Sequence, residues 1–99
     1  MTEPLDFVAD VSEENGCIVV TLGGELDVAT APELERLLAT HALGDLELDL
    51  SALEFLDSSG LAVMLGATMK RRVTLRRPNE LIVCVLDITG VLDKFEIVP

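Results

Sequence analysis

Apolar and polar residues alternate at the start of the chain, which is the pattern of a half-buried strand. From Leu5 to Val11 apolar side chains fall on every second position, so one face of this strand would be buried. Asn15-Gly16 favours a hairpin turn, and residues 17–22, CIVVTL, form the apolar run of a more fully buried strand. The sequence therefore predicts a β-hairpin at its beginning.

The period changes after the glycine-rich stretch GGELDVA, and the new spacing predicts a helix. Thr30 and Glu33 have the spacing of a capping box, and Pro32 suits the first helical turn. The predicted core-facing stripe has three leucines: Leu34, Leu37 and Leu38. His41 falls at the edge of this stripe, as a helix-end side chain, and Gly44 is expected to end the helix.

A strand and a second helix follow, separated by a short polar segment, residues 57–60, which we call the seam. Residues 46–50, LELDL, alternate as a strand, and FLDSSGLAVML then places two serines and a glycine between two apolar runs. We expect a helix from about Ser59 to about Leu75, stopped by Pro78, with Gly66 allowing a close approach to the sheet. Its expected core face is Leu61, Met64, Leu65 and Thr68.

The last third of the chain can be divided in two ways. Residues 80–85, ELIVCV, are interpreted as a strand because β-branched residues are weak helix formers. In the alternative register residues 79–90 form a helix and residues 73–77 a strand. A short segment broken at Gly90 and a final strand at 96–98 complete the chain. The pattern predicts an α/β fold, in which helices pack on a single sheet of four to five strands.

The composition is that of a globular protein with a strongly acidic balance. Of 99 residues, 49% are hydrophobic and 25% are charged, and the formal net charge is −11. Nucleic acids and anionic membranes both require cationic protein, so we expect neither as a partner. Five of the seven cations gather in one segment: Lys70, Arg71, Arg72, Arg76 and Arg77. They are either a solvated helix end or a docking patch for an acidic partner.

Several features favour a cytoplasmic protein without a metal or cofactor. The first ten residues carry acidic and no basic side chains, unlike a signal peptide, and no apolar run approaches the roughly 20 residues that cross a bilayer. Cys17 and Cys84 lie in apolar runs and are expected to be buried free thiols in a reducing compartment. With His41 as the single histidine, a metal site is not expected.

The seam itself lacks the components of a catalytic site. A serine nucleophile needs a nearby base, whereas the only histidine belongs to a different helix. The chain has neither a Gly-x-Ser-x-Gly elbow nor a glycine-rich phosphate loop with a lysine. We therefore predict no catalytic residues. A serine at a helix start could be a phosphoacceptor, because free N–H groups there tolerate a phosphate, or it could simply cap the helix.

Three stretches carry a resemblance to a known family: GELDVATAPELERLL, LELDLSALEFLDSSGLAVMLGA and LDITGVLDKF. Together they are similar to the STAS-domain anti-sigma factor antagonists over nearly the whole chain. The most specific part is Asp-Ser-Ser-Gly-Leu after an aliphatic strand. The resemblance implies that Ser58 is phosphorylated and that Asp27 is a loop aspartate close to it. It also implies a small mixed sheet with helices packed on it. The implied partner-binding residues are Asp27 in its loop and, within the motif, Asp57, Ser59, Gly60 and Leu61.

In that family an anti-sigma factor with serine kinase activity phosphorylates the antagonist, and a PP2C-type phosphatase removes the phosphate. The unphosphorylated antagonist binds the anti-sigma factor and so releases a sigma factor. The resemblance implies that residues 1–99 form one STAS domain, a non-enzymatic switch that is a monomer when free; nucleotide and Mg²⁺ would belong to the kinase. A second interpretation is a STAS adaptor subunit of a membrane transport or stress-sensing assembly, without a phosphorylation cycle.

One departure from the family follows from the preferred register. If residues 80–85 are a strand, the chain lacks most of the helix that family members carry before the Thr-Gly turn. A deletion after Val85 would explain this.

Overall fold

Strands and helices alternate along residues 7–99, the part of the chain that the structure, a computed structural model, describes. The elements are β1 (Val8–Glu14), β2 (Cys17–Leu26), α1 (Ala31–Thr40), β3 (Leu46–Leu56), α2 (Ser58–Thr68), β4 (Val73–Arg76), α3 (Glu80–Ile88), a 3-10 helix (Leu92–Lys94) and β5 (Glu96–Val98). Leu5, which the alternation included in the first strand, lies outside the described residues. No helix within the described range is long and apolar enough to span a bilayer.

The five strands form one mixed sheet, within the predicted four to five strands, and their order is β1-β2-β3-β4-β5. β1 and β2 are antiparallel, and the remaining neighbours are parallel. The hairpin between β1 and β2 is confirmed: Asn15 and Gly16 both have positive φ, 54° and 79°, as a tight two-residue turn requires.

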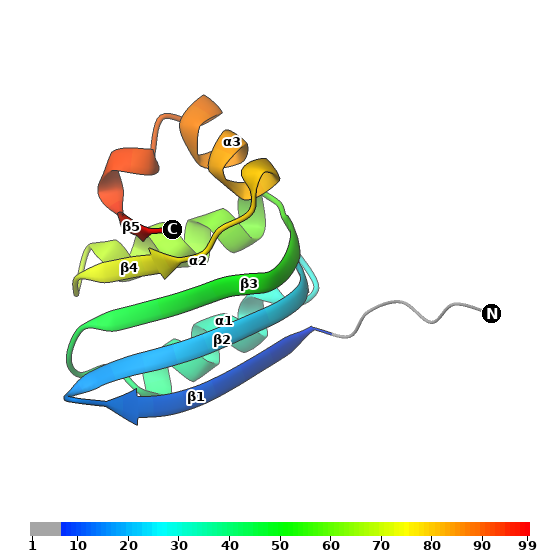
Figure 1. The fold of residues 1–99 in the computed structure, drawn as a ribbon. Coiled ribbons are helices and arrows are strands. Elements are labelled where there is room, and N and C mark those ends of the chain that lie inside the picture. The colour runs from blue at the N-terminus through cyan, green and yellow to red at the C-terminus, as the bar shows by residue number, and fades with distance from the viewer. Residues whose placement is uncertain (1–6) are drawn as a thin grey trace.

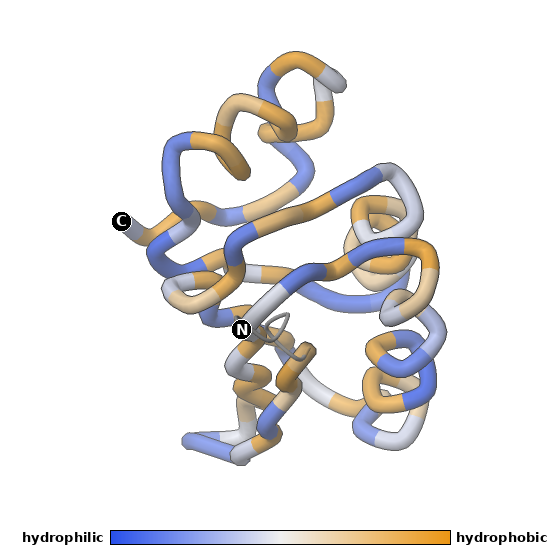
Figure 2. Tube along the Cα trace, turned by 90° about the vertical axis from the view of Figure 1, so that its right-hand side faces the viewer, coloured by the Kyte–Doolittle hydropathy of each residue, from blue (hydrophilic) through white to orange (hydrophobic). Residues whose placement is uncertain are grey.

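Helices make the crossovers that parallel strands require, and their placement leaves one face of the sheet open. In Figure 1, α1 and α2 lie behind the sheet, while α3 and the 3-10 helix stand beyond β4. The carboxyl ends of β2, β3 and β4 all point to the right of that view, and Figure 2 looks directly at this edge of the sheet.

The core lies between the sheet and its helices. Alternate side chains of β2 and β3 point toward α1 and α2, which contribute Leu34, Leu38 and Met64. The inward residues of the two strands are Ile18, Val20, Leu22, Leu46, Leu48 and Leu50. The alternation predicted for β3 is confirmed, and the strand continues six residues beyond position 50, to Leu56.

The preferred division of the last third of the chain is wrong, and the alternative register is correct. α2 ends at Thr68, and β4 (Val73–Arg76) is the strand, because Val73 and Leu75 are buried beside β3. Residues 80–88 form α3, whose first turn is capped by the Asn79 side chain, which accepts from the Ile82 N–H at 2.9 Å. Core burial and this cap outweigh the low helix propensity of the β-branched residues. No helix is missing after Val85, so no deletion is needed.

Three local predictions also need correction. Cys84 is exposed and Cys17 is half-buried, because α3 turns Cys84 outward, so the pair are not buried thiols. α1 ends at Thr40 with His41 as its C-cap, ahead of Gly44. Gly66 makes no close approach, since a Cβ there would meet nothing within 4 Å.

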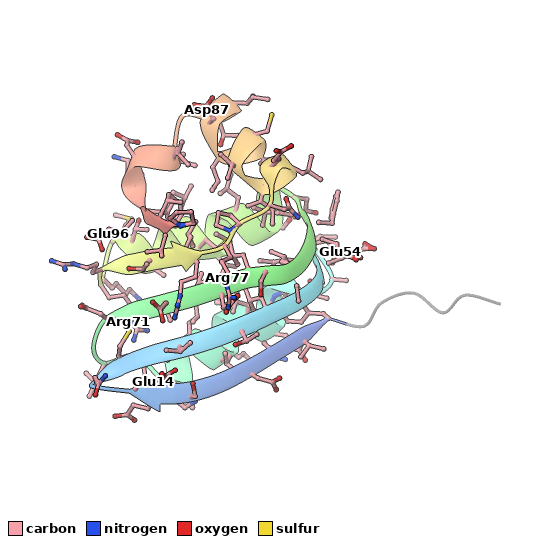
Figure 3. All side chains as sticks on the ribbon, viewed as in Figure 1. Glu14, Glu54, Arg71, Arg77, Asp87 and Glu96 are labelled. Carbon is pink, nitrogen blue, oxygen red and sulfur yellow. The ribbon has the colours of Figure 1, made fainter. Side chains whose placement is uncertain are left out.

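The basic segment does not belong to a helix end, because the last turn of α2 carries no basic residue. Residues 70–72 lie between α2 and β4, Arg76 is the last residue of β4 and Arg77 follows it. Three of its arginines form ion pairs with strand carboxylates: Arg72 with Glu96, Arg76 with Glu47, and Arg77 with Asp49. Figure 3 shows Arg77 over the open face of the sheet. These cations therefore tie neighbouring strands together across that face.

Asp49 is the most strongly held carboxylate of the open face. It accepts hydrogen bonds from the Ser51 N–H at 3.0 Å, the Ser51 hydroxyl at 2.7 Å and Arg77 Nη2 at 2.8 Å. Partial burial raises the pKa of Asp49, but the bonds from Ser51 and Arg77 outweigh burial and lower this pKa to about 2.

Replacing Asp49 with Asn should therefore destabilise the protein in a pH-dependent way. A carboxylate with a lowered pKa stabilises the folded state above its unfolded pKa of about 4, and this contribution is lost as the pH falls toward about 2. Melting temperatures of the wild type and Asp49→Asn should differ at neutral pH and converge near pH 2. The control is Asp93→Asn, at an exposed carboxylate of the 3-10 helix. A constant difference across the pH range would contradict the assignment.

Candidate functional site

The seam lies at the carboxyl edge of the sheet, where two parallel strands end side by side. Leu26 of β2 pairs in register with Leu56 of β3, and the Asp57 N–H donates to the Leu26 carbonyl at 3.1 Å. The next residues, Asp27 and Asp57, therefore begin two adjacent loops. This juxtaposition is the one expected from the sequence for the Asp27 loop and the seam.

Asp57 is the cap of α2. Its backbone is extended, with φ −110° and ψ −176°, and its carboxylate accepts from the N–H groups of Ser59 at 2.9 Å and Gly60 at 3.1 Å. The alternative in which a serine caps the helix is therefore wrong. The capping aspartate leaves both serine hydroxyls free of that task and places negative charge where the helix dipole favours it.

Ser58 is the first residue of α2, and its side chain faces solvent. Ser58 is exposed, whereas Ser59 is half-buried. Within residues 7–99 no hydrogen-bond acceptor or donor engages the Ser58 hydroxyl. An exposed, unengaged hydroxyl at a helix start can be reached by another protein's active site without local unfolding.

Gly60 and Leu61 hold the start of α2 against β2. A Cβ on Gly60 would lie 2.5 Å from Leu26 Cγ and 2.9 Å from the Leu26 carbonyl oxygen, so any side chain would force the helix away. Leu61 is buried at 7% exposure. Both residues lie beneath the surface, so their contribution to the site is to position the two serines.

Asp27 is half-buried and organises its own loop. Its carboxylate accepts from the N–H groups of Ala29 at 3.0 Å and Thr30 at 3.2 Å, while the Asp27 N–H donates to the Thr30 hydroxyl at 2.9 Å. Thr30 makes no side-chain cap to α1, so the predicted capping box with Glu33 is wrong. The Asp-x-x-Thr spacing was the sequence signal for this reciprocal turn.

Apolar side chains surround the two loops, and the sequence analysis missed them. Three large ones are exposed toward the carboxyl edge: Val28 at 71%, Phe55 at 43% and Leu81 at 56%. Leu81 reaches this edge because α3 begins beside β3, where Asn79 Nδ2 donates to the Leu53 carbonyl at 3.1 Å. Figure 3 places Glu54 at the same edge. The sequence feature that could have revealed this apolar surface is Phe55, an aromatic residue at an exposed position of β3.

In the described part of the chain, the carboxyl edge does not bring an imidazole base or a set of metal ligands close to Ser58. The single histidine, His41, caps the far end of α1, and so no imidazole stands near Ser58. Across residues 7–99 no three histidine, cysteine or acidic side chains gather as metal ligands. What the edge presents is an accessible hydroxyl at the start of α2, with the Asp57 cap before it in the chain and the Asp27 loop on the neighbouring strand.

Comparisons with known proteins identify the family of this chain. The family model described as "Mlab, STAS domain" matches residues 9–99. The anti-sigma-F factor antagonist RsfB of Mycobacterium tuberculosis is 36% identical over 73 residues, 71% of this chain and 60% of RsfB. The matched part is thus less than two thirds of RsfB.

Two further relatives match over more of their length. The anti-sigma-B factor antagonist of Bacillus subtilis is 35% identical over 100 residues, 94% of this chain and 92% of that protein. The crystal structure of an anti-sigma factor antagonist from Mycobacterium paratuberculosis superposes with a TM-score of 0.81 and 30% identity, covering 100% and 91% of the two chains. The predicted α/β fold and family resemblance are confirmed.

Two glycines of α2 provide a matched test of how closely this helix packs against β2. Gly60→Ala should destabilise the protein by about 1–3 kcal/mol, because the new methyl group meets Leu26. Gly66→Ala, where the Cβ meets open space, should stabilise it by up to about 1 kcal/mol through helix propensity. Urea unfolding of both variants measures the difference, and equal effects would show that α2 is not held at Gly60.

A second pair of variants tests the loop role of Asp27. Asp27→Ala should cost about 0.5–2 kcal/mol, because the N–H groups of Ala29 and Thr30 lose their acceptor. Asp27→Asn keeps an acceptor oxygen and should stay within about 0.5 kcal/mol of the wild type. An unchanged melting curve for the Ala variant would contradict this loop role.

Proposed function

Because the chain belongs to the STAS-domain family and is similar to antagonists from Mycobacterium and Bacillus, we propose that it is an anti-sigma factor antagonist switched by phosphorylation of Ser58. In its unphosphorylated form it binds an anti-sigma factor that is also a serine kinase, and so releases a sigma factor. A PP2C-type phosphatase restores the bound form. Nucleotide and Mg²⁺ are supplied by the kinase, and the switch operates in the cytoplasm.

One observation carries this proposal: Asp57 caps α2, so the exposed Ser58 next to it has no part in the cap. Asp57 satisfies the N–H groups of Ser59 and Gly60, so modification of Ser58 removes no hydrogen bond of the fold. A phosphoryl group adds a charge of about −1.5 to −2 and three acceptor oxygens at a helix N-terminus, where both are tolerated. The fold can therefore persist while its surface changes.

The surroundings of Ser58 explain how the added charge would act on a partner. Val28 and Phe55 offer apolar area to the anti-sigma factor, and Asp27, Asp57 and Ser59 form the polar centre. The carboxylates already make this edge negative. Covering a further anion there would cost several kcal/mol without a matching cation on the partner. The partner must accept this surface before phosphoryl transfer and release it afterwards, so we expect no such cation.

The first test of this function is the position of the phosphate. Incubation with the cognate anti-sigma kinase and ATP should add one phosphate, at exposed Ser58, and mass spectrometry of proteolytic peptides would locate it. Ser59→Ala should still be modified, whereas Ser58→Ala should not. Phosphate on Ser59 with Ser58 unmodified would reject the assignment.

The second test is binding by charge variants of Ser58. Ser58→Asp and the phosphorylated protein should lose affinity for the anti-sigma factor by about 100-fold or more, consistent with several kcal/mol of unpaired charge. Ser58→Ala, which cannot be charged, should bind persistently. Calorimetric titration measures all three, and circular dichroism melts check that each is folded, since added charge at the helix start is locally favourable. Tight binding by Ser58→Asp, or its unfolding, would contradict the switch.

A further inference from the structure

A groove between α1 and α2 lies away from the phosphoacceptor edge. Its volume is about 540 Å³, within the range of small-molecule sites. Small side chains leave this space open, chiefly Ala39 on α1 and Ala62, Gly66 and Ala67 on α2. Gly66 adds to the opening because a Cβ at this position would meet nothing within 4 Å. Apart from Glu35 on α1, the helical walls of the groove are therefore apolar.

The end of the groove beyond Thr68 is positively charged. Lys70 and Arg71 line it there, in a chain whose net charge is −11. Within residues 7–99 neither forms an ion pair, although Arg72, Arg76 and Arg77 of the same segment all do. The two cations of this segment without a carboxylate partner are thus the two that face the groove.

Arg71 is held in place by the loop between α1 and β3. Its guanidinium donates to the carbonyls of His41 at 2.7 Å, Gly44 at 2.8 Å and Leu43 at 3.1 Å. These acceptors are neutral, so they fix the side chain without cancelling its charge. A fixed positive group at the end of an apolar groove can orient an anion at low entropic cost.

We propose that this groove binds a free fatty acid, with its carboxylate at Lys70 and Arg71 and its alkyl chain between the two helices. The apolar walls match the chain, and the uncompensated cations match the acid. Glu35, which also lines the groove from α1, would repel the carboxylate and so favours the cationic end for it. This site is independent of the proposed phosphorylation at Ser58.

The probe is decanoate, titrated below its micelle-forming concentration into the isotopically labelled full chain and followed by amide chemical shifts. Saturable shifts should appear at Ala39, Ala62, Gly66 and Ala67. Gly66→Leu, whose Cβ meets nothing within 4 Å, should occupy the groove and abolish them. Lys70→Gln should weaken binding about two- to fivefold, as for an exposed ion pair. Lys94→Gln, at an exposed lysine of the 3-10 helix, should change nothing.

Comparison with 1-decanol isolates the contribution of charge in the wild type, so the test survives if a variant misfolds. Decanoate should bind more tightly than decanol. Equal affinities, shifts outside the groove, or unchanged binding by folded Gly66→Leu would overturn the proposal. If the amide chemical shifts of the groove residues change with protein concentration and not with decanoate, the groove binds a second copy of the chain. If the protein floats with phosphatidylglycerol vesicles but does not bind decanoate, the groove binds a membrane surface. Either of these two results would contradict a fatty-acid site.

Discussion

The parallel register of β2 with β3 is the constraint on which the rest of the site depends. It brings Leu26 and Leu56 side by side, and the bond from the Asp57 N–H to the Leu26 carbonyl continues that pairing into the first residue of the seam. α2 then starts so close to β2 that only glycine fits at position 60. The position of Ser58 is therefore fixed by the sheet, with no loop flexibility needed to present it.

Because of this constraint, the residues at the start of α2 have different roles. Asp57 caps the helix, Gly60 and Leu61 seat it, and Ser58 is left exposed with no structural role of its own. Asp27 organises the adjacent loop through Ala29 and Thr30. A charge added to Ser58 can thus change what a partner meets while the hydrogen bonds that define the edge persist, which is the physical requirement of the proposed switch.

The sequence predicted those parts in which local pattern and tertiary packing agree. The Asn15-Gly16 hairpin, the alternation of β3 and the start of α2 all follow from it. Residues 80–88 were misassigned because their β-branched propensity favours a strand, whereas burial of β4 beside β3 and the Asn79 cap decide for a helix. The roles of Gly60 and Gly66 were likewise unpredictable, since only the packing of α2 shows which glycine meets Leu26.

The central claim is that Ser58 can be charged while the β2–β3 edge and α2 remain intact. Hydrogen exchange followed by amide NMR, on the protein before and after phosphorylation of Ser58, tests this most directly. The account predicts chemical-shift changes confined to the Asp27 loop and the first turn of α2, with protection of the sheet and of the Ser59 and Gly60 amides retained. Loss of protection at those two amides, or along α2, would contradict it, because the Asp57 cap would then have broken.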